Sequence, residues 1–198
     1  MTATGRSKMA VVHNGFRAAL AIAPALINGA AGDDARRARV GSFFASTLAL
    51  IEAHHREEEE ALFPLLIERI PEERMTVDVG IEEHHRMLSL LAAAKASVTE
   101  WVAAGDHHSL PALSALAAFN DAFAAHMDHE EATIVPLLEE HLTEETWTKF
   151  EEQLRARLPL LAELLLPVAF GLSLLWEAVG EASFKDLIGH ADRLPSPA

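Results

Sequence analysis

The sequence contains no cysteine. This absence excludes disulfide bonds, iron–sulfur clusters, zinc sites built from thiolates and cysteine nucleophiles. Tyrosine is also absent, which excludes a tyrosyl-radical enzyme. A metal site in this chain must therefore use imidazole and carboxylate ligands, which suit iron, zinc, copper or manganese. The chain has 11 histidines from which the imidazoles can come.

Basic residues are also scarce, because 16 Lys and Arg stand against 30 Asp and Glu, for a formal charge of −14. Such a chain repels phosphate backbones, and no local basic patch is visible, so we expect no nucleic-acid partner. Half of the residues are hydrophobic, which argues against a disordered chain. The very apolar run from Leu164 to Trp176 has only 13 residues and contains Pro167 and Gly171, so we expect no transmembrane segment.

The N-terminus needs a separate check, because Arg6 and Lys8 precede an alanine-rich stretch in the way that a signal peptide begins. However, Asn14 and Arg17 interrupt the front of the apolar region, and cleavage would remove His13. We therefore expect a cytoplasmic protein.

Apolar residues recur at steps of three and four, so helices are the only regular elements that the pattern predicts. Helix starts are expected at Asp33–Asp34 and Pro71, and a helix end at Gly105. Ser109 is expected to cap the helix that follows. Pro24 is expected to kink the first helix.

Four helices with short connections predict an all-α fold, an antiparallel up-down four-helix bundle over residues 1–142. Residues 143–198 are expected to form a C-terminal helical extension. We expect this extension to pack on the bundle as a flap. The alternative is a surface for a homodimer or another partner, because large exposed apolar patches usually have a role. The last residues, 195–198, are expected to be disordered.

Two segments of the chain share the same pattern of histidine, glutamate and proline. They read His54-His-Arg-Glu-Glu58-Glu-Glu-Ala-Leu-Phe-Pro64 and His126-Met-Asp-His-Glu130-Glu-Ala-Thr-Ile-Val-Pro136. In both segments the proline follows the histidine by ten residues and the glutamate by six. Each has an upstream histidine, His13 at a distance of 41 residues and His84 at a distance of 42. The bundle is therefore expected to consist of two related helical hairpins.

The spacing of these motifs predicts a pair of metal ions. Residues four apart on a helix share a face, and this face otherwise carries Phe, Leu and Ile. Burying two carboxylates and four imidazoles without partners would cost many kcal/mol, which a metal pair would offset. A single His-x-x-x-Glu is more often a solvated surface pair, so the matched repetition is what favours metal binding. Four imidazoles and two carboxylates suit two iron ions with positions left open for an oxygen species.

The order of ligands separates this pattern from ferritin-like di-iron proteins, which carry Glu-x-x-His. Over roughly residues 9 to 142 the chain resembles the hemerythrin, or HHE cation-binding, family. The hallmark of that family is His…His-x-x-x-Glu in two copies, with an apolar pair and a proline after each glutamate. Leu62-Phe63-Pro64 and Ile134-Val135-Pro136 fit that hallmark.

This resemblance implies a non-haem di-iron centre with an oxo or hydroxo bridge. It assigns four terminal histidine ligands and two bridging glutamates, namely His13, His54, His84 and His126 with Glu58 and Glu130. Oxygen-carrying hemerythrins have a fifth histidine and usually an aspartate as the second bridge. The smaller set of histidine ligands in this chain argues against reversible oxygen carriage and favours peroxide chemistry or sensing.

Neighbouring histidines compete for two of these places. His55 forms a second i,i+4 pair with Glu59, but alignment of the prolines places His55 opposite Met127, so the repeat favours His54. His84 is preferred to the adjacent histidine at position 85, which stays an alternative. Other acids beside the motifs are expected to form a solvated face that at most tunes the electric field of the site: Glu57, Glu59, Glu60, Asp128 and Glu131.

Three further residues complete the expected surroundings of the site. His129, three residues from His126, is expected to support the ligands from outside. Phe123 and Ile51 lie one turn before the motif histidines and are candidates for walls of the pocket. Four histidines at helix ends or outside the bundle are not expected to be ligands: His107, His108, His141 and His190.

The expected function is that of a di-iron protein that reacts with or senses oxygen species, most simply by decomposing hydrogen peroxide in an oxidative-stress response. The expected partners are small molecules, namely H2O2, O2 and NO. The alternative is non-enzymatic binding or sensing of O2 or NO, or iron storage. A third alternative is a single structural zinc ion, which would leave the protein colourless.

Overall fold

The computed structural model describes residues 4–157. Every regular element in this range is helical, so the all-α prediction is confirmed. The elements in chain order are α1 (Thr4–Ala21), α2 (Ala23–Asn28), α3 (Asp34–Glu57), the π-helical η1 (Glu58–Leu62), α4 (Phe63–Arg69), the 3₁₀ turn η2 (Pro71–Glu73), α5 (Arg74–Ala104), the 3₁₀ turn η3 (Asp106–His108), α6 (Ser109–His141) and α7 (Glu144–Arg157).

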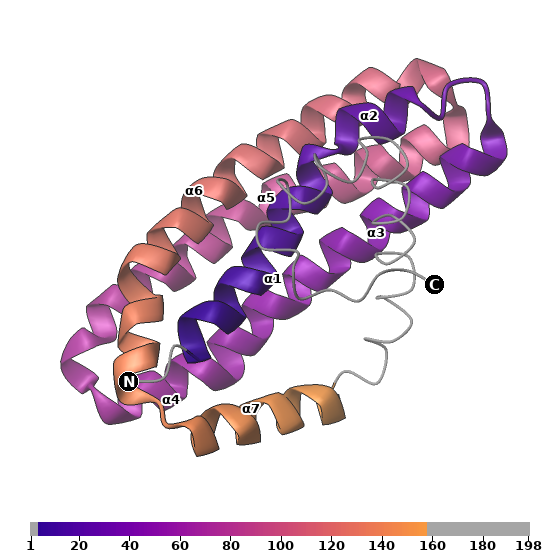
Figure 1. Ribbon diagram of the computed structural model, residues 1–198. Helices are drawn as coiled ribbons and strands as arrows, with labels where there is room; N and C mark the ends of the chain where they lie inside the picture. Colours follow the sequence, from indigo (N-terminus) through magenta and orange to yellow (C-terminus); the bar gives the residue numbers. More distant parts are fainter. Residues whose placement is uncertain (1–3, 158–198) are drawn as a thin grey trace.

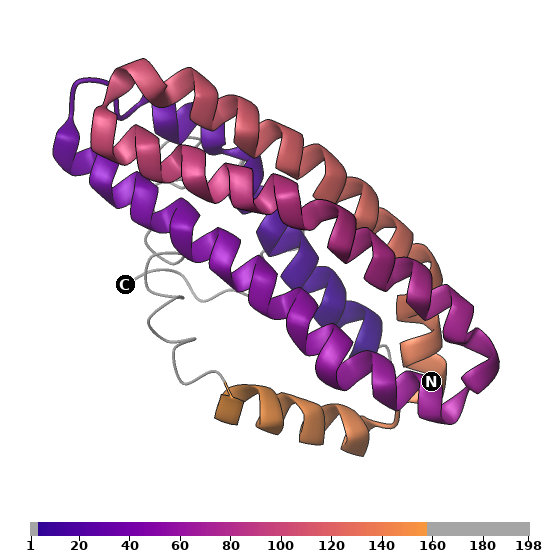
Figure 2. The ribbon, with the colours of Figure 1, turned by 180° about the vertical axis from the view of Figure 1, so that it is seen from behind.

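The helices form an elongated bundle (Figure 1). The α6 helix packs against both α5 and α1, and α3 packs against α5. Seen from behind, α3 and α5 run along the near side of the bundle (Figure 2). The predicted helical stretches are subdivided in the described part of the chain. The first is split into α1 and α2, and the second passes from α3 through η1 into α4.

Local sequence signals account for the ends of these helices. The side chain of Asp33 caps α3 by accepting a hydrogen bond from the backbone N–H of Arg36 at 2.8 Å. Gly105 ends α5 with φ of 86°, a conformation that costs glycine little. Ser109, expected as the cap, is instead the first residue of α6, and His108 occupies the cap position. Pro24 falls in the first turn of α2, where the first stretch is interrupted as expected.

The apolar core is divided into two clusters by a polar layer. Along α3 and η1, Ile51 belongs to the larger cluster and Leu62 to the smaller one. Along α6, Met127 belongs to the larger cluster and Ile134 to the smaller one. The histidine and glutamate motifs lie between these residues on each helix. The fold therefore brings the motifs to one level of the bundle.

The helical stretch Pro71–Ala104 is long and apolar enough to cross a membrane, judged by length and composition alone. This is weak evidence, since a core helix of a soluble protein passes the same test. The stretch packs against α3 and α6 and carries His84, which is 2 % exposed. We therefore treat it as a bundle helix, and the absence of a transmembrane segment stays a prediction.

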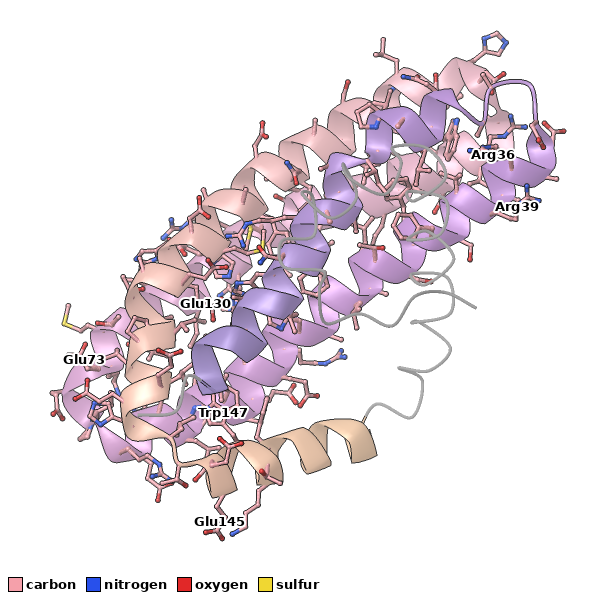
Figure 3. All side chains as sticks on the ribbon, viewed as in Figure 1. Arg36, Arg39, Glu73, Glu130, Glu145 and Trp147 are labelled. Carbon is pink, nitrogen blue, oxygen red and sulfur yellow. The ribbon has the colours of Figure 1, made fainter. Side chains whose placement is uncertain are left out.

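The described beginning of the C-terminal extension packs on the bundle. Trp147 of α7 is 7 % exposed and joins the smaller core cluster. Figure 3 shows Trp147 on the side of α7 that faces the bundle. The boundary expected at residue 142 stays a prediction. The expected surface within 164–176, the expected disorder of 195–198 and His190 lie outside the described residues.

Candidate metal centre

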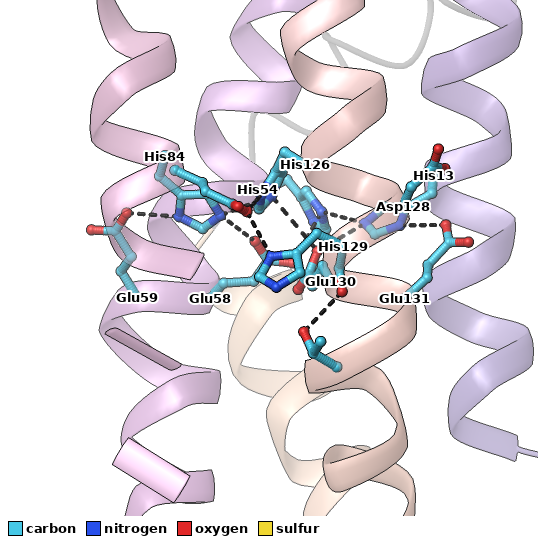
Figure 4. Close-up of polar contacts among 12 residues, drawn as sticks. His13, His54, Glu58, Glu59, His84, His126, Asp128, His129, Glu130 and Glu131 are labelled. Carbon is cyan, nitrogen blue, oxygen red and sulfur yellow. Dashed lines mark hydrogen bonds and ion pairs between the residues drawn. The ribbon is translucent and has the colours of Figure 1, made fainter. Parts of the chain in front are cut away.

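The structure brings the six predicted ligands together from different helices. They are His13 on α1, His54 on α3, Glu58 at the start of η1, His84 on α5, and His126 and Glu130 on α6. Figure 4 shows them in one layer across the bundle. All are buried except His54, whose side chain is 14 % exposed.

The four histidines form two pairs that meet through their Nε2 atoms. His13 Nε2 lies 3.3 Å from His54 Nε2, and His84 Nε2 lies 3.1 Å from His126 Nε2. Each half of the chain therefore contributes one pair. Two imidazole nitrogens this close, in a layer of carboxylates, are an arrangement that a shared ion explains.

Each of the two buried glutamates reaches both histidine pairs. Glu58 Oε1 lies 3.0 Å from His54 Nε2, and Glu58 Oε2 lies 3.6 Å from His84 Nε2. Glu130 Oε2 lies 3.4 Å from His13 Nε2 and 3.8 Å from His126 Nε2. Each carboxylate therefore lies between the two pairs of imidazoles.

The oxygens of Glu58 and Glu130 show how well the site suits a metal. All four are buried without a hydrogen-bond partner among the described residues, although histidine nitrogens lie nearby. Burial raises the pKa of both carboxyl groups, to about 8 for Glu130. Two unpaired buried carboxylates are strongly unfavourable, and bound cations would satisfy them. The ligand atoms of His13, His54 and the two glutamates all lie within 4.8 Å of one another.

A second set of carboxylates holds the outer nitrogens of the histidines. Glu59 Oε1 accepts a hydrogen bond from His84 Nδ1 at 2.8 Å. Glu131 Oε1 accepts one from His13 Nδ1, also at 2.8 Å. A proton on Nδ1 leaves the lone pair of Nε2 free to bind a metal, and the hydrogen bond fixes the orientation of the ring.

The prediction that the acids beside the motifs form a solvated face is therefore wrong for several of them. Glu59 and Glu131 are 28 % and 32 % exposed in their side chains, and both contact predicted ligands. Glu57 is buried. Asp128 does lie in solvent, but it accepts a hydrogen bond from Arg17 at 2.7 Å. Arg17 also donates to Glu131 at 2.7 Å, so it fixes the carboxylate that holds His13.

Glu83 on α5 is a supporting residue that the sequence patterns did not reveal. Its Oε2 accepts hydrogen bonds from His126 Nδ1 and from His129 Nδ1, both at 3.0 Å. His129 is thus placed outside the ligands, in the position expected for it. The only signal in the sequence is that Glu83 precedes His84, and a solvated glutamate would look the same.

Burial keeps the histidines of the layer in the neutral form that binds metals. It lowers the pKa of His13 to about 4 and that of His84 to about 3. It also lowers the pKa of His54 and His126. Near pH 7 these imidazoles are uncharged and have lone pairs to share.

The structure also separates the competing histidines. His85 is 62 % exposed in its side chain and lies outside the layer, whereas His84 is inside it. His55 is buried, but its ring stacks on His84 and does not join the His13–His54 pair. Phe123 is fully buried and nearly parallel to His126, with ring centroids 6.3 Å apart, as a wall residue would be.

The π-helical segment η1 begins at Glu58 and was not predicted. In the second copy of the motif, α6 continues as an α-helix through Glu130 and Pro136. A π-helical turn inserts one extra residue, and such turns are frequent at functional sites. Here the π-helical turn begins at Glu58, which lies near His54 and His84. The next residue, Glu59, accepts a hydrogen bond from His84.

Comparison with known proteins agrees with this geometry. Residues 4–138, more than half of the chain, match the hemerythrin HHE cation binding domain. No curated protein and no solved structure gives a significant match. The resemblance seen in the sequence is therefore confirmed, and a domain of this kind binds metal cations, typically iron. The chain belongs to the hemerythrin HHE cation-binding family.

Proposed function

We propose that this chain is a non-haem di-iron protein that reacts with or senses small oxygen species, with decomposition of hydrogen peroxide as its leading activity. The ligands would be the six residues of the buried layer: His13, His54, Glu58, His84, His126 and Glu130. We also infer that the four helical stretches carrying them form the antiparallel up-down frame expected from the sequence. We place the protein in the cytoplasm.

One observation carries the proposal of two metal positions. Four Nε2 atoms converge as two pairs, and two carboxylates without hydrogen-bond partners among residues 4–157 lie between these pairs. One ion for each histidine pair would use every one of these atoms. A single structural zinc ion would leave one pair of imidazoles and part of the carboxylate oxygens unsatisfied.

The donor set favours redox chemistry with small molecules. Two iron ions would supply the two electrons that interconversion of peroxide with water or O2 requires. The chain itself keeps its imidazoles neutral, fixes them through outer carboxylates and surrounds them with apolar residues. Phe123 and Ile51 are fully buried beside the layer and limit the access of water.

The second candidate function is binding or sensing of O2 or NO without turnover, or iron storage. The observation that favours it is the apolar wall, because an uncharged diatomic molecule enters such surroundings more easily than an ion does. Phe16 lies beside His54 with ring centroids 5.4 Å apart, and it also contacts Phe123 at 5.8 Å. Sensing would also need a partner that binds differently to the ligand-free and ligand-bound forms of the protein.

The test begins with metal content and an optical spectrum of the purified protein, beside the variants His54→Ala and Glu130→Ala. The proposal predicts two irons per chain, with near-ultraviolet bands that both variants lose. His85→Ala is the matched control, because His85 neighbours a predicted ligand but is exposed, and it should keep both irons. Less than one metal per chain, or bands that persist in both variants, would overturn the di-iron centre.

Titration of the iron-loaded protein separates the two candidate functions. Evolution of O2 from added peroxide, lost together with iron in Glu130→Ala, would support peroxide decomposition. A stable O2 or NO complex that reverses under vacuum, without peroxide turnover, would support binding and sensing.

A further inference from the structure

His55 is a buried imidazole that the proposed set of ligands does not use. It is 8 % exposed, and its Nε2 is buried without a hydrogen-bond partner among the residues that the structure describes. An unpaired polar group in a protein interior is unfavourable. The structure therefore places a hydrogen-bonding nitrogen in the core, and no group within residues 4–157 pairs with it.

The position of His55 links it to one of the two histidine pairs. Its ring stacks on that of His84, with centroids 4.1 Å apart and an angle of 14° between the planes. It stands perpendicular to His126, with centroids 5.2 Å apart. Ligand nitrogens of the three residues lie within 4.8 Å of one another. His55 thus faces the His84–His126 pair.

The stacking argues that His55 is a neighbour of a bound metal and not a further ligand to it. An ion bound by an imidazole nitrogen lies close to the plane of that ring. Because the rings of His55 and His84 are nearly parallel and stacked, their planes do not meet at a common ion. The Nε2 of His55 therefore stays available to a small molecule that binds beside the His84–His126 pair.

The two halves of the protein differ at this position. The motif alignment places Met127 opposite His55, and Met127 is fully buried. A thioether is a weak acceptor and cannot donate a hydrogen bond, whereas a neutral imidazole has one N–H. The first half therefore places a donor beside the histidine pair of the second half, whereas the second half has an apolar side chain at the equivalent position.

We propose that His55 donates a hydrogen bond from Nε2 to a small anion or oxygen species, and that it thereby makes the His84–His126 side the binding side of the centre. Peroxide belongs to this class of ligand, and azide is a stable probe of the same class. This proposal rests on the di-iron function proposed above. Phe123 packs against the edge of His55, with centroids 5.4 Å apart, and keeps this face of the pocket apolar.

The experiment compares azide binding by the iron-loaded wild type with that of His55→Met, which copies the residue of the other half. Azide is titrated optically, and iron is counted in the same samples. His55→Met should keep both irons and bind azide at least roughly tenfold more weakly, which corresponds to about 1.4 kcal/mol. Met127→Leu, the matched change in the other half, should bind azide as the wild type does.

A second variant separates the loss of the hydrogen-bond donor from a change in packing. His55→Gln keeps an N–H donor and should recover part of the azide affinity that His55→Met loses. Loss of one iron in His55→Met would identify His55 as a ligand and overturn the proposal. Unchanged azide affinity with both irons present would overturn it as well, since His55 would then only fill space. A wild type without iron would instead overturn the di-iron function itself, and this inference with it.

Discussion

Glu59 and Glu131 occupy equivalent places in the two halves of the protein, and each holds a histidine of the opposite half. Glu59 accepts a hydrogen bond from His84 Nδ1, and Glu131 accepts one from His13 Nδ1, both at 2.8 Å. Each glutamate directly follows the buried glutamate of its own motif. The two halves of the chain are therefore joined at the centre by reciprocal hydrogen bonds.

Removal of one of these outer carboxylates should weaken iron binding without removing a ligand. In Glu131→Ala the ring of His13 loses the acceptor that orients it and fixes its tautomer. Loss of such a partner typically lowers metal affinity roughly 10- to 100-fold. The measurement is competition for iron against a chelator of known affinity, and Glu59→Ala should behave in the same way.

The control for this prediction is Glu82→Ala. Glu82 is 70 % exposed in its side chain, and its ion pair with Arg86 lies on the surface at 3.2 Å. Its removal should leave iron affinity unchanged. Equal affinities for wild type, Glu131→Ala and Glu82→Ala would show that the outer carboxylates do not support the ligands.

Chelation of the metal should lower the thermal stability of the whole chain. Glu58 and Glu130 are buried without partners within residues 4–157, so bound cations stabilise only the folded state. At a free metal concentration 1,000 times the dissociation constant, this linkage is worth about 4 kcal/mol. For a chain of this size that corresponds to a fall in Tm of roughly 8–16 °C after chelation. Glu130→Ala is the control, and chelator should leave its Tm unchanged.

Much of the fold was predictable because its signals are local. The cap at Asp33, the break at Pro24 and the end at Gly105 each act within a few residues, and each lies where it was expected. The convergence of the motif residues followed from the repeat, because matched spacing on two hairpins brings equivalent positions to the same level of a bundle.

The remaining features depend on packing between helices. The π-helical segment at Glu58 adds one residue to a turn, and no residue type marks that insertion. Glu83 and Glu131 look like solvated glutamates until the neighbouring helix brings a histidine to each of them. His55 and His54 are adjacent, and only the position of α5 decides that His55 stacks on His84.

The stability of the metal-free protein should fall as the pH rises above 6.5. Burial raises the pKa of Glu130 from 4.5 to about 8, so between these values the folded state binds more protons than the unfolded chain. Burial lowers the pKa of His13 and His84 from 6.5, which has the opposite effect, but only below pH 6.5. Above pH 6.5 only the buried glutamates still bind more protons in the folded state than in the unfolded chain. The free energy of unfolding therefore decreases as the pH rises.

Urea unfolding of the metal-free protein at pH 6.5 and pH 8 measures this effect. The free energy of unfolding should decrease by an amount on the order of 1–2 kcal/mol. Glu130→Gln cannot ionise at this position, so its decrease should be smaller. A stability that rises between the two pH values would contradict the buried, partly protonated state of the glutamates in the metal-free fold.

The contact between α3 and α5 depends on the small size of Gly41. A Cβ atom at this position would overlap Val102 Cγ2, and valine is β-branched and has little freedom to move aside. Gly41→Ala should therefore destabilise the protein by about 1–3 kcal/mol, measured by urea unfolding of the iron-loaded chain. Combining it with Val102→Ala should restore part of this loss, because the second change removes the overlapping methyl groups.

Gly15 supplies the matched control for this prediction, since it also lies within a helix but has nothing within 4 Å of a Cβ atom placed there. Gly15→Ala should stabilise the protein by about 0.4–1 kcal/mol, because alanine loses less backbone entropy on folding. The two substitutions are chemically identical, so opposite signs would assign the effect of Gly41→Ala to the packing of α3 on α5. The same sign at both positions would refute the close approach at Gly41.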